Sequence, residues 1–517
     1  MPTRCLIKAG EYHDSVTLMQ TAQELTQLRG VNDAAVVMAT EANRGILREA
    51  GLLVTEIEGA SANDLVIVVQ AVSEEVAQHA LDLAETHLAR RPSTLASGAR
   101  WQARTVRAAV RSSPQSNLAV ISVAGRYAAA EAWEALKSGL HVLLFSDNVP
   151  LREEVALKQY AAARGLLLMG AGCGTAIING VALGFANVLP QGPVGIVAAA
   201  GTGLQEVSTL LAKLGVGITQ GIGTGGRDLK QAVGGIMMLE GLKALQSDPE
   251  TKVLLVVSKP PSPTIAERVL HQAKQGTKPT VVCFLGSDPA PIAAAGVIPA
   301  RTLQEAAYLA AAQVDGYTGA AASDVIQQET TELRAQAVEC RKRLKPGQKY
   351  LRGLFSGGTL TSEALVIWEE ILGGVLSNAA LESRLELKDA TRCEGNCAVD
   401  LGAEEFTVGR PHPMIDNELR IRRLMQEAID PEVGVIMLDV VLGYGAHPDP
   451  ASELGPAIRQ AQGASRARQL IVVTSVTGTK EDPQGLERQI GTLRDAGAIV
   501  CNSNAAAARL AGFIVAQ

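Results

Sequence analysis

Three segments of the chain combine glycines with hydroxyl side chains where an apolar run gives way to helical spacing. They are 196–206, 221–228 and 354–360. Glycine lets the backbone approach an anion closely, and the free N–H groups at the start of a following helix point at that anion. These residue types in this position indicate phosphate binding. The predicted phosphate-binding residues are Gly201, Thr202, Gly203, Gly223, Gly225, Gly226, Ser356, Gly357, Gly358 and Thr359.

Each glycine segment also has a purely structural interpretation, because short connections use glycine for turns alone. Gly221, Gly223 and Gly226 have the spacing of a dinucleotide-binding loop, but no acidic strand end follows about 20 residues on. The chain contains no Gly-x-x-x-x-Gly-Lys-Ser/Thr motif, which excludes a Walker-type nucleotide site. Three loops in corresponding places favour anion binding over turns.

Charged residues follow two of the predicted strands. Arg227 and Asp228 are the last two residues of the second glycine segment. A guanidinium there could clamp a phosphate or a carboxylate with two hydrogen bonds, while Asp228 could instead cap the next helix. Lys259 comes after the predicted strand 253–258, at the end of the sheet where ligands bind in α/β proteins. We predict catalytic roles for Arg227 and Lys259, with a solvated loop lysine as the alternative for Lys259.

A second group of candidates lies in the last third of the chain. Arg410 and His412 sit in a loop flanked by Gly and Pro, and His412 could donate a proton to a departing amide nitrogen or anchor a substrate. The alternative is a loop histidine bonded to the backbone. Asp416 could orient one of them. Asp439 interrupts an apolar strand, where an unpaired acid is costly. It is either a wall of the site or a buried acid that bonds loop amides.

The spacing of apolar residues predicts elements that would position these side chains. From residue 114 on, short Val/Ile/Leu runs alternate with helical patterns, as in 194–198, 204–214 and 252–258, and again from 350–355 to 433–440. Hydrophobic residues make up 47% of the chain but aromatic residues only 3%, so the cores are aliphatic. The predicted fold class is α/β, with several doubly wound parallel-sheet domains of Rossmann or flavodoxin type after a small α+β N-terminal module.

The same reading divides the chain into five parts. The first is a ferredoxin-like α+β module, the fourth is a linker helix, and the other three are α/β domains. Similar strand–glycine–helix starts near 197 and 355 suggest that two of these domains are built alike. The predicted ranges are 1–105, 112–191, 192–314, 315–346 and 347–517.

Charge and cysteine content narrow the function classes. The net charge of −6 gives no basic surface for nucleic acid. The seven cysteines are scattered, and only Cys393 and Cys397 lie close together. We interpret these two as incidental loop thiols, with a zinc or redox role as the alternative, and predict no metal. No apolar run approaches the roughly 20 residues that span a bilayer, and the N-terminus has no signal-peptide pattern, so we expect a cytoplasmic protein.

Several longer motifs point to a known family. They lie at 144–148, 169–174, 223–229, 257–261, 354–360 and 408–416. On these motifs residues 118–312 resemble the α subunit of succinyl-CoA synthetase, and the whole chain resembles the FdrA family, often labelled acyl-CoA synthetase FdrA. The resemblance implies a CoA-binding-like Rossmann domain at 112–191, a synthetase-like flavodoxin domain at 192–314 and a ligase-like domain at 347–517.

The resemblance also implies a chemistry. Synthetases of this kind pass phosphate through a histidine in the loop that corresponds to 286–296, and that loop contains no histidine here. FdrA also resembles the large subunit of oxamate carbamoyltransferase, whose reaction needs phosphate-binding loops but no covalent histidine. We therefore expect a carbamoyl or acyl transfer between phosphate and a small ureido or carboxylic acid such as oxamate. The alternatives are an ADP-forming acyl-CoA ligase and a non-catalytic ligand-binding or scaffold subunit.

The expected ligands and partners follow from these readings. Phosphate or carbamoyl phosphate is the first ligand, CoA and ATP are further ones, and no covalent cofactor is predicted. A second protein subunit, a homo-oligomer or both would complete the assembly, with no nucleic-acid or membrane partner.

Overall fold

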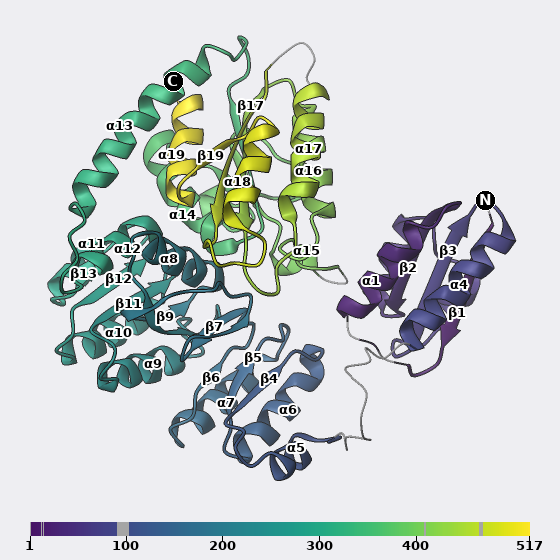
Figure 1. The fold of residues 1–517 in the computed structure, drawn as a ribbon, viewed down its shortest axis with the longest axis horizontal. Coiled ribbons are helices and arrows are strands. Elements are labelled where there is room, and N and C mark those ends of the chain that lie inside the picture. The colour runs from purple at the N-terminus through teal and green to yellow at the C-terminus, as the bar shows by residue number, and fades with distance from the viewer. Residues whose placement is uncertain are drawn as a thin grey trace. The chain divides into compact units, whose positions relative to one another are not determined.

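The computed structural model describes residues 2–11, 13, 15–89, 103–407, 410–464 and 469–516. The chain forms two compact units, of which one contains Met1–Gln102 with Glu404–His412 and the other contains Ala103–Ala403 with Pro413–Gln517. Figure 1 labels their elements. Each unit is described by itself below.

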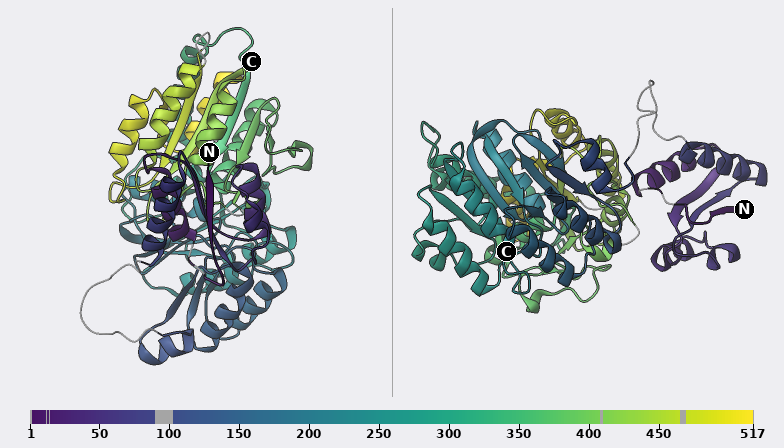
Figure 2. Two further views of the ribbon diagram at one scale, coloured as in Figure 1. Left: turned by 90° about the vertical axis from the view of Figure 1, so that its right-hand side faces the viewer. Right: turned by 90° about the horizontal axis from the view of Figure 1, so that it is seen from below.

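The N-terminal unit is a small antiparallel sheet with helices on both faces (Figure 2). Strand β3 pairs with β1 on one side and β2 on the other. Apolar residues of α1 and α4 pack on one face of β3, and those of α2 and α3 pack on the other. The elements are β1 (Thr3–Lys8), α1 (Ser15–Thr26), β2 (Val31–Met38), α2 (Glu41–Glu49), α3 (Thr55–Glu58), β3 (Leu65–Ala71) and α4 (Glu74–Ala89). Helix α15 (Glu404–Thr407) belongs to the same unit.

The larger unit begins with a three-stranded parallel sheet in the order β4-β5-β6. Its strands are short and its core is aliphatic, with alanines of α6 packed on the strands. The elements are α5 (Val106–Ser112), β4 (Leu118–Ile121), α6 (Gly125–Lys137), β5 (His141–Leu144), α7 (Leu151–Ala162) and β6 (Leu168–Met169).

A seven-stranded sheet follows in the order β13-β12-β11-β9-β10-β7-β8. Its first five strands in that order are parallel, and β7 and β8 form an antiparallel hairpin at one edge. Asn179 and Gly180 make the hairpin turn with positive φ angles of 50° and 76°, the geometry of an Asn-Gly type I′ turn. The elements are β7 (Thr175–Ile178), β8 (Val181–Gly184), β9 (Gln191–Ala199), α8 (Gly201–Lys213), β10 (Ile218–Gly223), α9 (Ile236–Ser247), β11 (Val253–Ser258), α10 (Pro263–Gln275), β12 (Thr280–Phe284), α11 (Pro289–Ala294), β13 (Ile298–Pro299) and α12 (Leu303–Ala312).

The last sheet is six-stranded, in the order β15-β16-β14-β17-β18-β19, and all its pairs are parallel. Helix α13 was predicted as a linker. Its buried residues Leu333, Ala337 and Cys340 pack into an apolar core that contains residues of both the seven-stranded and the six-stranded sheet. The elements are α13 (Ala322–Arg341), β14 (Tyr350–Phe355), α14 (Gly358–Leu372), β15 (Leu376–Ser377), η1 (Ser383–Leu385), β16 (Cys397–Asp400), α16 (Glu418–Ala428), β17 (Val433–Val441), α17 (Pro450–Ala464), β18 (Ile471–Thr477), α18 (Leu486–Asp495), β19 (Ile499–Cys501) and α19 (Asn504–Val515).

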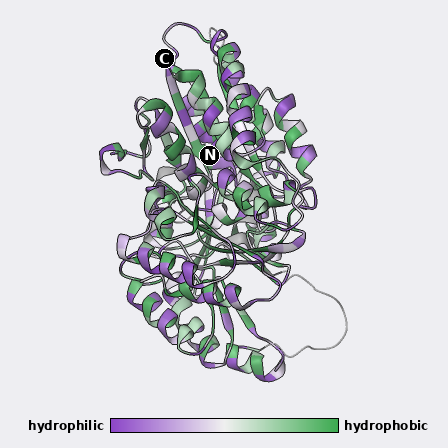
Figure 3. Cartoon of the chain, turned by 90° about the vertical axis from the view of Figure 1, so that its left-hand side faces the viewer, coloured by the Kyte–Doolittle hydropathy of each residue, from purple (hydrophilic) through white to green (hydrophobic). Residues whose placement is uncertain are grey.

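The last two sheets share one strand order. When the two-residue strand β15 is left out, the parallel strands of both sheets run in chain order second, first, third, fourth and fifth, as β10-β9-β11-β12-β13 and as β16-β14-β17-β18-β19. This confirms that the two domains are built alike, and it confirms the predicted α/β fold class. Helix α8 follows β9 and helix α14 follows β14, each the first parallel strand counted above, and both helices contribute to one apolar core. Figure 3 shows the alternation of apolar and polar residues along the helices, as expected when each buries one face.

The structure also bears on the state of the cysteines and on the expectation that no segment spans a membrane. Cys393 and Cys397 form a disulfide, so the interpretation as two incidental thiols is wrong, whereas Cys5, Cys173, Cys283, Cys340 and Cys501 are free. Among the described residues, no helix is long and apolar enough to cross a membrane.

Candidate anion-binding site between two helix N-termini

The N-termini of α8 and α14 meet inside the larger unit. A Cβ atom added to Gly203 would lie 2.8 Å from Thr359 Cγ2, and one added to Gly357 would lie 2.8 Å from Thr202 Cγ2. Each loop therefore carries glycine where a threonine of the other loop packs. Because the N-terminus of a helix has exposed N–H groups and a partial positive charge, two such ends in contact attract an anion.

This contact predicts a difference between two glycines of the sequence-predicted set. Replacing Gly357 by alanine should destabilise the protein by about 1–3 kcal/mol, because the new methyl group overpacks the junction with Thr202. Gly226→Ala is the matched control, since no atom lies within 4 Å of its Cβ position. Urea unfolding of both variants checks the prediction. Equal midpoints for the two variants would contradict the close contact.

The segment just before α14 (Ser356 and Gly357, the α14 loop) already binds a carboxylate of the protein itself. Asp439 is fully buried, and its carboxylate accepts hydrogen bonds from Ser356 N at 2.7 Å, from Ser356 Oγ at 2.9 Å and from Gly357 N at 3.0 Å. Arg420 Nη2 neutralises the same carboxylate at 3.0 Å from Oδ1. The sequence predicted that Ser356 and Gly357 bind phosphate; in the structure Asp439 takes that place. The alternative interpretation of Asp439, a buried acid bonding loop amides, is confirmed.

The start of α8 (Gly201–Gly203, the α8 loop) has no corresponding carboxylate on the neighbouring strand. In the strand register, Leu354 pairs with Leu438 just before Asp439, and the equivalent residue Val197 pairs with Val256 just before Val257. An apolar side chain thus stands on β11 where β17 carries the acid. The N–H groups of Gly201, Thr202 and Gly203 are the first of α8, which have no acceptor within the helix. This loop is the better placed of the two to hold an external anion.

A cation and an acid lie at the start of α14. A Cβ atom on Gly358 would lie 2.9 Å from Lys259 Nζ and would overlap Asp400 Oδ2. Lys259 follows β11 and Asp400 ends β16, so the two sheets each contribute one charge to this point. Asp400 Oδ1 accepts a hydrogen bond from Gly402 N at 3.0 Å, and Asn378 Oδ1 accepts one from Asp400 N at 2.9 Å. The structure therefore brings Lys259 to the helix N-termini, as the strand-end position suggested.

Asp400 is a site residue that sequence reasoning missed. In the sequence, Asp400 is a carboxylate at the end of the short apolar run 397–400. This run contains no turn residue and was not predicted as a strand. Only the pairing of β16 with β14 places this strand end beside Gly358.

The second glycine segment has packing roles in the structure. Gly223 comes so close to the carbonyl oxygen of Thr175 that a Cβ would overlap it, and Gly225 has a φ of +86° with a Cβ position 2.5 Å from Ala171 O. Both glycines thus pack against the segment that leads into β7. Phosphate binding by Gly223, Gly225 and Gly226 stays a prediction that none of these contacts supports.

Arg227 and Asp228 pair with two buried charged residues of α7, and Asp228 is itself buried whereas Arg227 is partly exposed. Arg227 Nη2 lies 2.8 Å from Glu154 Oε2 and donates to Val149 O at 2.8 Å. Asp228 Oδ1 accepts from the fully buried Lys158 at 2.8 Å, and Oδ2 accepts from Met238 N at 2.8 Å, which caps α9 as the alternative for Asp228 proposed. These contacts join α7 to the loop after β10, and the catalytic role of Arg227 stays a prediction.

Three candidates from the sequence remain. Arg410 and His412 belong to the N-terminal unit, so their catalytic roles stay predictions from the sequence. Asp416 Oδ1 accepts from Glu418 N at 2.7 Å, at the start of α16. This contact gives Asp416 a capping role at that helix.

Two buried glutamates hold the helix pair together, and sequence reasoning missed both. Glu206 and Glu363 stand five residues after the first residue of α8 and of α14, respectively. Glu206 accepts from Asn504 N at 2.9 Å at the start of α19, and Glu363 accepts from Leu303 N at 2.7 Å at the start of α12. Each helix thus caps the last helix of the opposite domain, which fixes the two N-termini against each other.

Glu363 makes stability depend on pH. Burial, and then the charge of Glu206, raises the pKa of Glu363 from 4.5 to about 7. The folded protein keeps a proton that the unfolded chain releases, so this contribution is complete below pH 4.5 and is lost as pH rises through about 7. We expect a loss of about 3 kcal/mol at most over this range. Urea midpoints measured across it should fall for the native protein and stay flatter for Glu363→Gln. The exposed Glu370→Gln serves as control, and parallel profiles for all three would contradict the assignment.

Comparison with family models places three known domain types on the chain. Residues 1–104 match a model described as "AllF, heavy metal-associated domain", residues 191–286 match "CoA binding domain" and residues 354–514 match "CoA-ligase". The second of these ranges contains α8 and the third contains α14.

The residues of the N-terminal unit do not fit a heavy-metal site. Soft metal ions are held by cysteine thiolates, and Cys5 is the one cysteine in residues 1–104. Among the described residues no group of three or more His, Cys, Asp or Glu side chains could hold a metal ion. No step of the chemistry is therefore assigned to a metal there.

Three curated proteins are similar to this chain in sequence. "ADP-forming sulfoacetate-CoA ligase subunit SauD" of Bilophila wadsworthia is 27% identical over 36% of this chain and 64% of its own length. "Succinate--CoA ligase [ADP-forming] subunit alpha 1" of Archaeoglobus fulgidus is 29% identical over 34% of this chain and 60% of its own length. "Uncharacterized protein YahF" of Escherichia coli is 43% identical over 98% of this chain and 97% of its own length. The chain therefore belongs to the family of YahF.

Proposed function

We propose that this protein is a subunit of an enzyme that handles acyl phosphates, of the ADP-forming acyl-CoA ligase type. The observation that carries the proposal is the asymmetry of the two helix N-termini. Asp439 occupies donors of the α14 loop, whereas Val257 stands at the equivalent position beside the α8 loop. The phosphate group of an acyl phosphate would therefore lie at Gly201–Gly203, with Lys259 beside it.

The residues of this site would act by position and charge. The N–H groups of Gly201, Thr202 and Gly203 and the hydroxyl of Thr202 donate to phosphate oxygens. Lys259 offsets the charge that builds up as phosphate leaves the acyl carbon, and Asp400 lies near the same point at the start of α14. The crossed caps of Glu206 and Glu363 keep the donors in place, so little reorganisation accompanies the reaction.

The proposal of a ligase is also supported by the family models and by the similar proteins described above. The matches to a CoA-ligase domain and a CoA binding domain include the helices α14 and α8 of the site, and the two ligases quoted above are named as subunits. We therefore propose CoA as a substrate and a second protein subunit as a partner. The chain aligns with 64% and 60% of the lengths of those two subunits, so the partner assignment rests on partial matches.

A second candidate function is carbamoyl transfer between phosphate and a small ureido acid such as oxamate. The observation that favours it is the loop after β12, residues 286–296, which has no histidine to carry phosphate. In this loop Asp288 instead caps α11 by accepting from Ala290 N at 2.9 Å. Carbamoyl phosphate is itself an acyl phosphate, so it would use the same donors at α8 without a covalent relay.

Thermal unfolding with phosphate, carbamoyl phosphate, CoA and ADP tests the proposal and separates its two forms. A ligand at a hundredfold excess over its dissociation constant stabilises the folded state by about 2.7 kcal/mol. Stabilisation by both phosphate and CoA supports the ligase. Stabilisation by phosphate and carbamoyl phosphate without CoA supports the carbamoyltransferase. Thr202→Val, which keeps the shape but removes the hydroxyl, should weaken the phosphate effect, and no response to phosphate in the native protein would contradict the site.

A further inference from the structure

The disulfide between Cys393 and Cys397 lies just before β16 and has no role in the proposed reaction. The bond joins residues four apart in sequence, and the other described cysteines are free. A disulfide that closes so short a loop constrains the unfolded chain little, so it contributes less to stability than one that closes a long loop. A purely structural role therefore explains this bond poorly.

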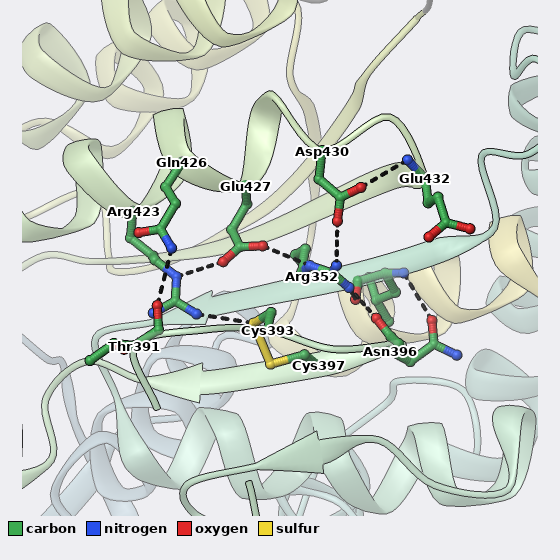
Figure 4. A network of polar contacts seen from close by, with 12 residues as sticks. Arg352, Thr391, Cys393, Asn396, Cys397, Arg423, Gln426, Glu427, Asp430 and Glu432 are labelled. Atoms are coloured by element: carbon green, nitrogen blue, oxygen red, sulfur yellow. Dashed lines mark hydrogen bonds and ion pairs between the residues drawn. A yellow bond between two sulfur atoms is a disulfide. The ribbon is translucent and has the colours of Figure 1, made fainter. Parts of the chain in front are cut away.

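An arginine is held against one of the two sulfur atoms (Figure 4). Arg423 Nη2 donates to Cys393 Sγ at 3.1 Å. The same guanidinium pairs with Glu427 Oε1 at 2.6 Å and donates to Ala390 O at 2.7 Å. Arg352 in turn holds Glu427 Oε2 at 2.7 Å. Because these contacts do not involve sulfur, Arg423 keeps its position when the disulfide is reduced.

The two cysteines differ in their surroundings. Cys397 is fully buried and begins β16, where it pairs with Arg352 and Leu376. Cys393 is partly exposed and faces the guanidinium. A positive charge next to a thiol favours the thiolate, which is the form that attacks disulfides. Cys393 is therefore the accessible and activated member, and Cys397 is the protected one.

We propose that Cys393 and Cys397 form a redox-responsive pair that exchanges with low-molecular-weight disulfides. The Cys393 thiolate attacks one sulfur of the small disulfide and releases one small thiolate, which leaves a mixed disulfide at Cys393. The Cys397 thiol loses its proton and attacks Cys393 Sγ, which releases the second small thiolate. In sum, two protein thiols are oxidised to one disulfide and the small disulfide is reduced to two thiols. The pair lies at the start of the strand that ends in Asp400.

The first test is the redox state of the pair in the native full-length protein. Samples are equilibrated with mixtures of reduced and oxidised glutathione, alkylated and digested with trypsin. Cleavage after Arg392 and Arg420 isolates both cysteines in one peptide without the other five, because Pro411 protects the bond after Arg410. We expect this peptide to carry two alkyl groups after reducing mixtures and none after oxidising mixtures. The change between the two states should be reversible. A pair that stays bonded in fully reducing mixtures, or open in fully oxidising ones, overturns the proposal.

The second test assigns the roles within the pair. In Cys397→Ser, oxidised glutathione should leave a stable mixed disulfide on Cys393, whereas in Cys393→Ser the buried Cys397 should not react. In reduced protein at neutral pH, Arg423→Gln should slow alkylation of Cys393 about three- to tenfold, because the thiolate loses its neighbouring positive charge. The neighbouring Arg422→Gln is the matched control, since Arg422 is exposed and pairs with Glu418. Reaction of Cys397 in place of Cys393, or equal rates in both arginine variants of unchanged fold, would overturn the assignment.

Discussion

Replacing Lys259 by methionine is expected to lower the turnover of an acyl phosphate by about 100- to 1,000-fold, the usual loss when one donor to a developing negative charge is removed. Lys259 Nζ lies 2.9 Å from the Cβ position of Gly358, at the point where the two helix N-termini meet. Methionine keeps an unbranched apolar stem of similar length, so packing along the side chain is largely retained while the charge is lost. The measurement is kcat/KM with carbamoyl phosphate and with an acyl phosphate, together with the dissociation constant of phosphate.

Lys252 provides the matched control for Lys259. It stands just before β11, whereas Lys259 stands just after it, and its ammonium group donates to Pro249 O at 2.5 Å. Lys252→Met removes the same charge from the opposite end of the same strand, so we expect native turnover. A small, equal effect of both substitutions would show that Lys259 does not act at the site, and it would remove the cationic part of the proposed mechanism.

Replacing Asp439 by alanine is expected to destabilise the larger unit by about 3–5 kcal/mol. The substitution leaves Arg420 as a buried charge without its partner, because both side chains are almost entirely buried, at 2% and 0% exposure. It also leaves the N–H groups of Ser356 and Gly357 without their acceptor. Each unsatisfied buried donor adds to the cost. The shift of the urea midpoint of the larger unit measures this loss.

A surface ion pair serves as the control for Asp439. Lys349 and Glu432 pair at 2.9 Å with about half of each side chain exposed, at 48% and 50%. Glu432→Ala should therefore change stability by about 1 kcal/mol or less. A further check replaces Asp439 and Arg420 together by apolar residues, which should recover part of the loss because no unpaired charge remains. A loss near that of Glu432→Ala for the single variant would contradict the buried network.

The strand pattern of the larger unit could be predicted because its strands are buried on both faces. Residues 350–355 were predicted as a strand and form β14, and the prediction for 433–440 differs from β17 by one residue. Such strands read as continuous aliphatic runs, and length then separates them from helices. The hairpin β7–β8 was missed although Asn179-Gly180 carries a strong local turn signal, because its strands are only four residues each.

Strand β16 and Asp400 show what a local pattern cannot reveal. The four residues 397–400 have no distinctive periodicity, and their place in the sheet depends on pairing with β14, more than 40 residues earlier in the chain. The same holds for Asp439. Its position inside a strand indicated that a partner was required, but only the folded chain shows that the partners are Arg420 and the α14 loop.

The sequence alone determined the fold class and predicted the kind of ligand. Aliphatic runs alternating with amphipathic helices specify parallel α/β sheets, and glycines after strands specify loops where an anion can approach backbone N–H groups. The tertiary structure decided which loop remains for the anion, since it places Asp439 at one helix N-terminus and Val257 beside the other. It also brought Lys259 and Asp400 together from two sheets. The physical reason is that local patterns set element type through short-range interactions, whereas a charge finds its partner only when distant strands pair.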